Sequence, residues 1–140
     1  MTTSYSGGCA CGAIRYEIDS EPLMSLHCQC LDCQRITGAG HASFLVFPAA
    51  QARLTGAPKF HGVIADSGNT ASRGFCASCG SFVVAKSTGH PDFFMVSAGS
   101  LDDPSRFAPQ AVVYASRAQR WDGIDPNLAR FPKLPPPPPR

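Results

Sequence analysis

The sequence predicts an all-β domain with minor helical turns, and three observations carry this prediction. Short stretches in which apolar and polar residues alternate, as they do in a half-buried strand, recur along the chain. Segments rich in Gly, Pro, Asn, Asp and Ser, which are the residues that turns require, separate these stretches. No segment has the length and the apolar period of a long amphipathic helix. Short strands at this spacing favour an all-β fold.

The candidate strands follow one another from residue 13 to residue 114. The first covers residues 13–18, where apolar and polar side chains alternate. The others are short runs, most of them rich in the aromatic and β-branched residues that strands favour. They are residues 43–47, 59–60, 81–85, 93–97 and 111–114.

Two short segments are expected to be helical, residues 31–36, which Gly38 ends, and residues 49–53.

The composition changes at Pro132, because six of the 13 prolines lie in the last nine residues. We therefore assign residues 1–131 to one domain and residues 132–140 to an extended, proline-rich tail. Two roles stay open for the tail, a spacer and a docking peptide for an aromatic groove.

The composition narrows the classes of function. The net charge is +2, and the lysines and arginines are scattered, so the basic face of a nucleic-acid-binding protein is missing and no nucleic acid is expected. No apolar stretch approaches the ~20 residues of a membrane helix, so no membrane is expected either. Residues 1–8 lack the charged and apolar regions of a signal peptide. A cytoplasmic location is therefore expected.

Seven cysteines lie in three clusters, and the chain has no others. Cysteines two or three residues apart are better placed to hold one ion than to form disulfides, and an odd count would leave one thiol unpaired. In a reducing compartment, clustered cysteines more often bind metal or react. The spacing predicts two zinc ions, and seven thiolates leave one of them a ligand short of four.

The outer cysteine pairs have the features of a structural zinc site. Cys76, Cys79 and Gly80 have the form of a zinc knuckle, in which glycine lets the backbone turn under the sulfurs. Cys9 and Cys11 supply two more thiolates if the first strand packs beside that turn. A closed site of this kind stabilises the fold. The alternative is that one pair is buried free cysteine.

The middle cluster consists of Cys28, Cys30 and Cys33, which lie within six residues, so one short loop offers three thiolates to one ion. Two alternatives remain for the fourth position. In the first, water or a small thiol fills it and the site is reactive. In the second, a side chain closes the site and makes it structural. The candidates for this fourth ligand are His27, His41, His61, His90 and Asp32.

The charge of the middle cluster favours thiol chemistry. Three thiolates leave zinc with a net negative charge, which weakens the acidification of water that hydrolytic zinc sites achieve with neutral histidines. Such a soft site suits an incoming sulfur, because binding lowers the pKa of a thiol and leaves it nucleophilic. The zinc deaminases fit less well, because the stretch His41-Ala-Ser43 lacks their glutamate.

Four motifs together carry a family resemblance. They are Gly8-Cys9-x-Cys11-Gly12, Cys28-x-Cys30-x-x-Cys33-x-x-x-x-Gly38, Phe75-Cys76-x-x-Cys79-Gly80 and Ala98-Gly99-Ser100-Leu101-Asp102. In order and spacing, from about residue 5 to residue 125, the chain resembles the glutathione-dependent formaldehyde-activating enzyme family, which also includes centromere protein V. The resemblance implies several coiled antiparallel β-sheets around two zinc sites.

The resemblance also implies roles for the cysteines. Four of them would hold a structural zinc, and the three of the middle cluster would hold a catalytic zinc. The structural set is Cys9, Cys11, Cys76 and Cys79, and the catalytic set is Cys28, Cys30 and Cys33. The implied activity is of the carbon–sulfur lyase type, the formation of S-hydroxymethylglutathione from formaldehyde and glutathione.

The expected function is zinc-dependent carbon–sulfur bond chemistry on glutathione, or a similar thiol, and a small aldehyde. Arg35 is the candidate for binding a substrate carboxylate, and Thr37 and Ser43 are further candidate pocket residues. Each of the three can equally be an ordinary surface, turn or strand residue. No residue stands out as a general base. The alternative function is a non-catalytic two-zinc module that binds a protein partner.

Overall fold

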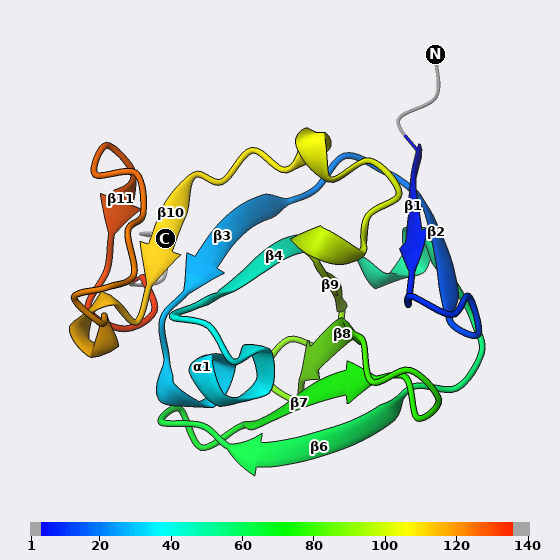
Figure 1. The fold of residues 1–140 in the computed structure, drawn as a ribbon, viewed down its shortest axis with the longest axis horizontal. Helices are drawn as coiled ribbons and strands as arrows, with labels where there is room; N and C mark the ends of the chain where they lie inside the picture. Colours follow the sequence, from blue (N-terminus) through cyan, green and yellow to red (C-terminus); the bar gives the residue numbers. More distant parts are fainter. Residues whose placement is uncertain (1–3, 136–140) are drawn as a thin grey trace.

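The computed structural model describes residues 4–135, which form two β-sheets and one α-helix with short 3-10 turns (Figure 1). The smaller sheet has the strand order β1-β2-β5. The larger sheet has the order β11-β10-β3-β4-β9-β8-β7-β6. The all-β class with minor helical turns is thus confirmed.

The strands are short, as the sequence predicts. The smaller sheet contains β1 (Ser4–Gly8), β2 (Arg15–Asp19) and β5 (Ala52–Thr55). The larger sheet contains β3 (Met24–Cys28), β4 (Ala42–Pro48), β6 (Lys59–Ile64), β7 (Thr70–Phe75), β8 (Phe82–Ser87), β9 (Phe93–Ser97), β10 (Ala111–Val113) and β11 (Ala129–Arg130). The 3-10 turns are η1 (Ala49–Gln51), η2 (Ala98–Ser100), η3 (Pro104–Arg106) and η4 (Ala115–Arg117).

The helix α1 (Leu31–Thr37) confirms the first helical prediction. The sulfur of Cys30 caps its first turn by accepting a hydrogen bond from the backbone N–H of Cys33. Gly38 ends the helix with φ of 70°, a left-handed conformation that glycine adopts without strain, and its N–H donates to the carbonyl of Gln34. The second helical segment is shorter than predicted, because the chain enters β5 at Ala52.

Most strand pairs are antiparallel, and β10 is the exception. It pairs in parallel with β3 on one side and with β11 on the other. The antiparallel sheets that the resemblance implies are thus joined by parallel pairs at this edge. A parallel pair needs a long crossover connection, and the chain between β3 and β10 includes six intervening strands.

Two apolar cores hold the sheets together. The first joins the smaller sheet to the larger one through Tyr16, Ile18, Leu45 and Phe47. The second lies beside α1 and includes Cys28, Cys33, Ala42, Phe44, Ala85 and Val113. Because two cysteines of the middle cluster belong to this second core, the fold itself fixes the position of their sulfurs.

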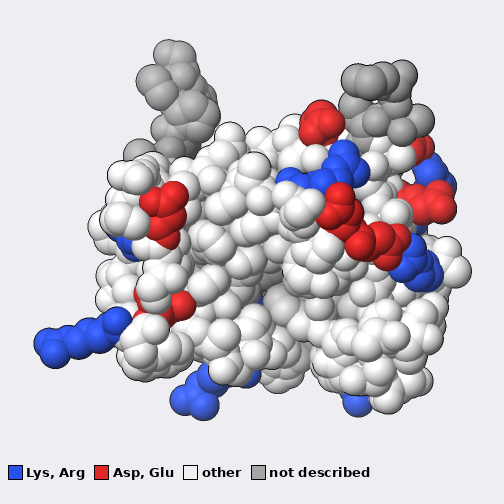
Figure 2. Space-filling model, turned by 45° about the horizontal axis from the view of Figure 1, so that its top comes forward, with Lys and Arg blue, Asp and Glu red and all other residues white. Residues whose placement is uncertain are grey.

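The larger sheet curls so that β6 and β7 pass close to α1 (Figure 1). On the face that Figure 2 shows, Lys and Arg side chains lie among Asp and Glu instead of forming a basic stripe. No helix within residues 4–135 is long and apolar enough to cross a membrane.

The predicted tail begins inside the described part of the chain. The carbonyls of Pro132 and Lys133 accept hydrogen bonds from the backbone N–H groups of Ser116 and Tyr114, at 3.3 and 3.1 Å. The polyproline conformation predicted for residues 136–140 lies outside the described residues.

Candidate functional site

The outer cysteines lie together, although 65 residues separate Cys11 from Cys76. Cys9 and Cys11 follow β1, and Cys76 and Cys79 follow β7. Their four sulfurs lie within 4.8 Å of one another. The backbone N–H of Ile14 donates to the sulfur of Cys9 at 3.2 Å, a contact that supports a thiolate.

The turn from Cys76 to Gly80 has the local geometry of a knuckle. Gly80 has φ of 79°, and its N–H donates to the carbonyl of Cys76 at 2.8 Å. The hydroxyl and backbone of Ser81 hydrogen-bond to Cys79 and lower the pKa of its thiol to about 5, which favours the thiolate form that binds metal. Four soft donors at this spacing fit a tetrahedral zinc site.

The middle cluster spans the junction between β3 and α1. Cys28 ends β3, Cys30 is the N-cap of α1, and Cys33 lies in its first turn. Their sulfurs also lie within 4.8 Å of one another, with Cys28 and Cys33 buried and Cys30 half-buried. Hydrogen bonds from the thiols of Cys28 and Cys33 lower the pKa of Cys30, so the cluster favours a thiolate even before an ion binds.

Within residues 4–135, no histidine or carboxylate joins the three sulfurs as a fourth ligand. His27 directly precedes Cys28 in β3, so the two side chains point to opposite faces of the sheet. On its own face, Nδ1 of His27 lies 2.9 Å from the hydroxyl of Ser43. The ring of His90 stacks on that of Phe93. Nδ1 of His41 hydrogen-bonds to the carboxylate of Asp122. The set of donors therefore has three protein ligands, the number found in reactive zinc sites.

Arg73 is the cation nearest to this cluster, and the sequence analysis did not identify it. It lies in β7, and its Nη2 is 3.3 Å from the sulfur of Cys33 and 3.6 Å from that of Cys30. Its Nε is buried and has no hydrogen-bond partner within residues 4–135. Arg35, by contrast, is exposed on α1 and does not line the pocket. The contact crosses 40 residues of sequence, so no local pattern could have signalled it.

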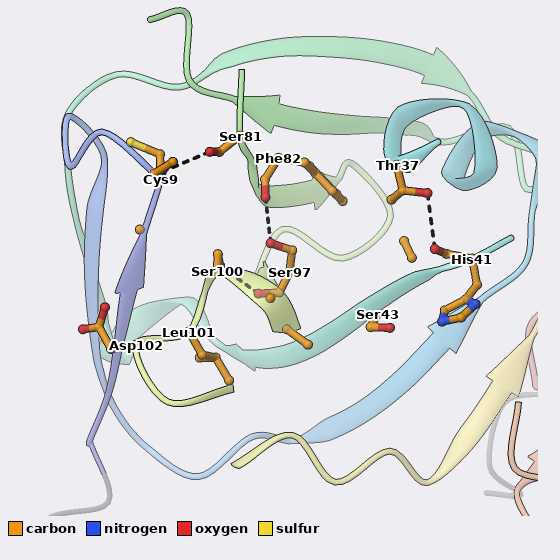
Figure 3. Close-up of a pocket in the computed structure, with 15 residues that line it drawn as sticks. Cys9, Thr37, His41, Ser43, Ser81, Phe82, Ser97, Ser100, Leu101 and Asp102 are labelled. Carbon is orange, nitrogen blue, oxygen red and sulfur yellow. Dashed lines mark hydrogen bonds between the residues drawn. The ribbon is translucent and has the colours of Figure 1, made fainter. Parts of the chain in front are cut away.

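A pocket of about 670 Å³ lies between the Cys9 turn and α1 (Figure 3). This volume falls in the usual range for small-molecule sites. Hydroxyl groups dominate its polar lining, and two of the sequence-predicted residues, Thr37 and Ser43, contribute to it. The other polar side chains that line it are those of His41, Ser81, Ser97, Ser100 and Asp102.

The pocket lies between the two sets of cysteines. Cys9 lines one side, whereas none of the three sulfurs of the middle cluster lines it. Ala42 and Phe82 line the pocket and also pack in the core that contains Cys28 and Cys33. The pocket and the middle cluster thus share residues of one apolar core.

Asp102 provides a fixed negative charge at the pocket wall. The guanidinium of Arg15 donates two hydrogen bonds to its carboxylate, at 2.9 and 2.6 Å, and the hydroxyl of Ser6 donates another at 2.7 Å. These contacts lower the pKa of Asp102 to about 2, with Arg15 the main cause. The carboxylate is therefore ionised at neutral pH.

A carboxylate–imidazole pair lies at the other end of the pocket. Nδ1 of His41 is 2.8 and 2.9 Å from the two carboxylate oxygens of Asp122. The ring of His27 contacts that of His41 edge to face, with centroids 4.6 Å apart. Burial, together with the proximity of His41, lowers the pKa of His27 to about 4. The pairing of His41 with Asp122 spans 81 residues, so no local pattern in the sequence indicates it.

The fold and the site define a small β protein with two cysteine clusters that could hold metal ions, one of four sulfurs and one of three, beside a polar pocket. The chain belongs to the glutathione-dependent formaldehyde-activating enzyme family, whose model matches residues 4–117. This match confirms the family indicated by the motifs.

Comparison with solved structures shows the same fold in a protein from Rhodobacter sphaeroides, known from a crystal structure. The two are 19% identical, the TM-score is 0.56, and the alignment covers 90% of this chain and 98% of the other. At that identity the likeness concerns the fold alone. Comparison with curated proteins finds no significant match.

Proposed function

We propose that this protein is a zinc-dependent enzyme of carbon–sulfur chemistry that converts glutathione and formaldehyde to S-hydroxymethylglutathione, and that also runs the reverse cleavage. Membership of the family supports the two substrates. The observation that carries the proposal is the set of three sulfurs without a fourth protein ligand, in a protein that also has a polar pocket of small-molecule size.

Two zinc ions complete the proposal. Cys9, Cys11, Cys76 and Cys79 would hold a structural ion, and Cys28, Cys30 and Cys33 would hold the catalytic one. When bound there, zinc would lower the pKa of a substrate thiol and keep its sulfur nucleophilic. The donor chemistry fits, because soft thiolates at this spacing select zinc over hard cations.

The chain's own residues then provide orientation and charge. Arg73 donates to the sulfurs of Cys30 and Cys33, so it orients two ligands and offsets their negative charge. Ionised Asp102 offers an acceptor for the ammonium group of glutathione. Thr37 and Ser43 would contact the substrates from the pocket wall, whereas Arg35, on the surface of α1, does not line this pocket.

The test is the rate at which the protein accelerates exchange between free glutathione and S-hydroxymethylglutathione in the presence of formaldehyde. Exchange NMR measures this rate at equilibrium, with the spontaneous rate subtracted. Zinc-loaded protein is expected to accelerate exchange, and Cys30→Ser is expected to abolish the acceleration while the protein remains folded. If loaded wild-type protein leaves the spontaneous rate unchanged, the proposed enzyme is excluded.

That negative result would favour the second function, a non-catalytic two-zinc module for a protein partner. No surface feature described above identifies such a partner, so the enzyme is the better supported function.

We also propose a cytoplasmic location, where glutathione is abundant and keeps cysteines reduced. The domain is proposed to end near Phe131.

A further inference from the structure

We propose that His41 is a catalytic residue that transfers the proton in this pocket, and that Asp122 is its positioning residue. The inference rests on the proposed function, because it names the proton carrier for the same thiol–aldehyde reaction. Asp122 lies beyond residues 4–117, the part of the chain that the family model matches. The pair is thus a feature of this chain that the family match does not assign.

The geometry of the pair fixes the tautomer of His41. An ionised carboxylate only accepts hydrogen bonds, so Nδ1, at 2.8 and 2.9 Å from its oxygens, carries the proton. In the neutral ring, Nε2 then bears a lone pair. This nitrogen has no hydrogen-bond partner within residues 4–135 and is not sealed from solvent. The imidazole is 22% exposed and the carboxylate 8%, so His41 is accessible and Asp122 is nearly buried.

The carboxylate of Asp122 is itself held in place. Gln29, which is only 1% exposed, donates to it through Nε2 at 3.1 Å. Gly40 provides the space, because a Cβ at that position would lie 2.3 Å from the carboxyl carbon of Asp122. Gln29 lies between Cys28 and Cys30, so the pair is linked to the loop that carries the middle cluster.

The hydroxyl of Thr37 links the backbone of His41 to α1. The hydroxyl of Thr37 lies 2.8 Å from the carbonyl of Cys33 and 3.3 Å from that of His41, and it hydrogen-bonds to both. Figure 3 shows Thr37 and His41 together on the α1 side of the pocket, with Cys9 on the opposite side. The imidazole therefore lines the pocket on the side of α1.

This placement gives the reaction a balanced proton path. The proton of the substrate S–H group moves to Nε2 of His41, and the carbon–sulfur bond forms as the C=O π pair moves to oxygen. The proton then passes from Nε2 to that oxygen and completes the hydroxymethyl thioether. No electron is gained or lost overall. In the reverse direction, Nε2 takes the hydroxyl proton and returns it to sulfur.

The activity test compares three zinc-loaded variants in the glutathione–formaldehyde exchange assay. His41→Gln is expected to lower the protein-dependent rate about 100-fold, the usual effect of losing a positioned acid–base group. Asp122→Asn is expected to lower it about 10-fold or more, because the ring loses its fixed tautomer. His90→Gln, in which the altered ring stacks on Phe93 away from the pocket, is the control and is expected to keep the wild-type rate.

A second readout is independent of activity. Two-bond proton–nitrogen NMR spectra distinguish a protonated from a bare imidazole nitrogen, and they are expected to show His41 with Nδ1 protonated and Nε2 bare. In Asp122→Asn this pattern is expected to be lost while zinc content is unchanged. Gly40→Ala, which displaces Asp122, should reproduce the loss, and Gly123→Ala, with no atom near its new Cβ, should not.

The outcomes separate the two proposals. If wild-type protein accelerates exchange and His41→Gln retains that acceleration, the inference is overturned and the proposed function stands. If Nδ1 of His41 proves bare, the inference is overturned whatever the rate. If wild-type protein gives no acceleration, the proposed function fails, and the catalytic role of His41 fails with it.

Discussion

Replacing Arg73 by glutamine is expected to weaken zinc binding at the three-cysteine site. Nη2 of Arg73 lies 3.3 and 3.6 Å from two of the three sulfurs. The guanidinium offsets the negative charge that three thiolates leave around a divalent ion, and it orients the two ligands. Glutamine keeps much of the length and hydrogen-bonding capacity but removes the charge.

The size of the effect follows from the charge and from the two hydrogen bonds. Zinc with three thiolates has a net charge of −1, and its attraction to the guanidinium contributes about 1 kcal/mol with the dielectric constant of water. The charge assistance of the two hydrogen bonds to sulfur contributes about 1 kcal/mol more. Because about 1.4 kcal/mol corresponds to a tenfold change in Kd, the expected loss of zinc affinity is about 30-fold. This value lies within the 10- to 100-fold loss that is usual when a residue behind the metal ligands is removed.

The assay is a competition titration with a chromophoric zinc chelator on fully loaded protein, followed until the second equivalent of zinc is lost. Arg35→Gln is the matched control, because it removes the same charge from the exposed surface of α1. Its zinc affinity is expected to equal that of wild type. If Arg73→Gln and Arg35→Gln release zinc at the same chelator concentration, the assigned role of Arg73 is refuted.

Two further predictions concern the division of the cysteines and the charge of the pocket. Cys79→Ser is expected to cost folding and solubility, whereas Cys33→Ser is expected to stay folded with about one zinc fewer, as circular dichroism and metal analysis would show. Equal collapse of both variants would contradict the division into structural and catalytic sites. Asp102 is expected to stay ionised until the pH falls to about 2, because Arg15 donates to its carboxylate. Its pKa is below the ordinary 3.8, so its contribution to stability is present above that pH and is lost as the pH falls through about 2. Carbon-13 NMR titration measures the midpoint, which is expected to return toward 3.8 in Arg15→Ala, and a wild-type midpoint near 3.8 would rule out this role of Arg15.

Local patterns were sufficient to predict the gathering of cysteines within each cluster. Spacings of two or three residues hold sulfurs close together whatever the rest of the fold does. The same holds for the end of α1, where Gly38 adopts the left-handed conformation that stops a helix. Features determined within about ten residues were thus predictable.

Some strands carried too little local information to be recognised. In β1, two of the five residues are glycine, and β7 includes Ser72, Arg73 and Gly74 with little apolar alternation. These segments form strands because neighbouring strands pair with them on the sheet, as β7 does between β6 and β8. The parallel position of β10 is likewise a result of topology.

The side chains that the sequence analysis missed at the site are joined by long-range contacts. Arg73 reaches the middle cluster only because the larger sheet curls round α1, and Asp122 meets His41 only because the chain after β10 returns beside β3. A single sequence carries no record of such contacts. A general base was therefore not expected, although the structure places an imidazole on the pocket wall.

The central claim is that the three-cysteine site accepts a thiol from outside the protein. The most direct test is to titrate glutathione into cobalt-substituted protein and follow the sulfur-to-cobalt absorption. A saturable change is expected, because three protein thiolates leave the ion room for one more sulfur. The change should disappear in Cys30→Ser and persist in Arg35→Gln. An unchanged spectrum at saturating glutathione would contradict the claim.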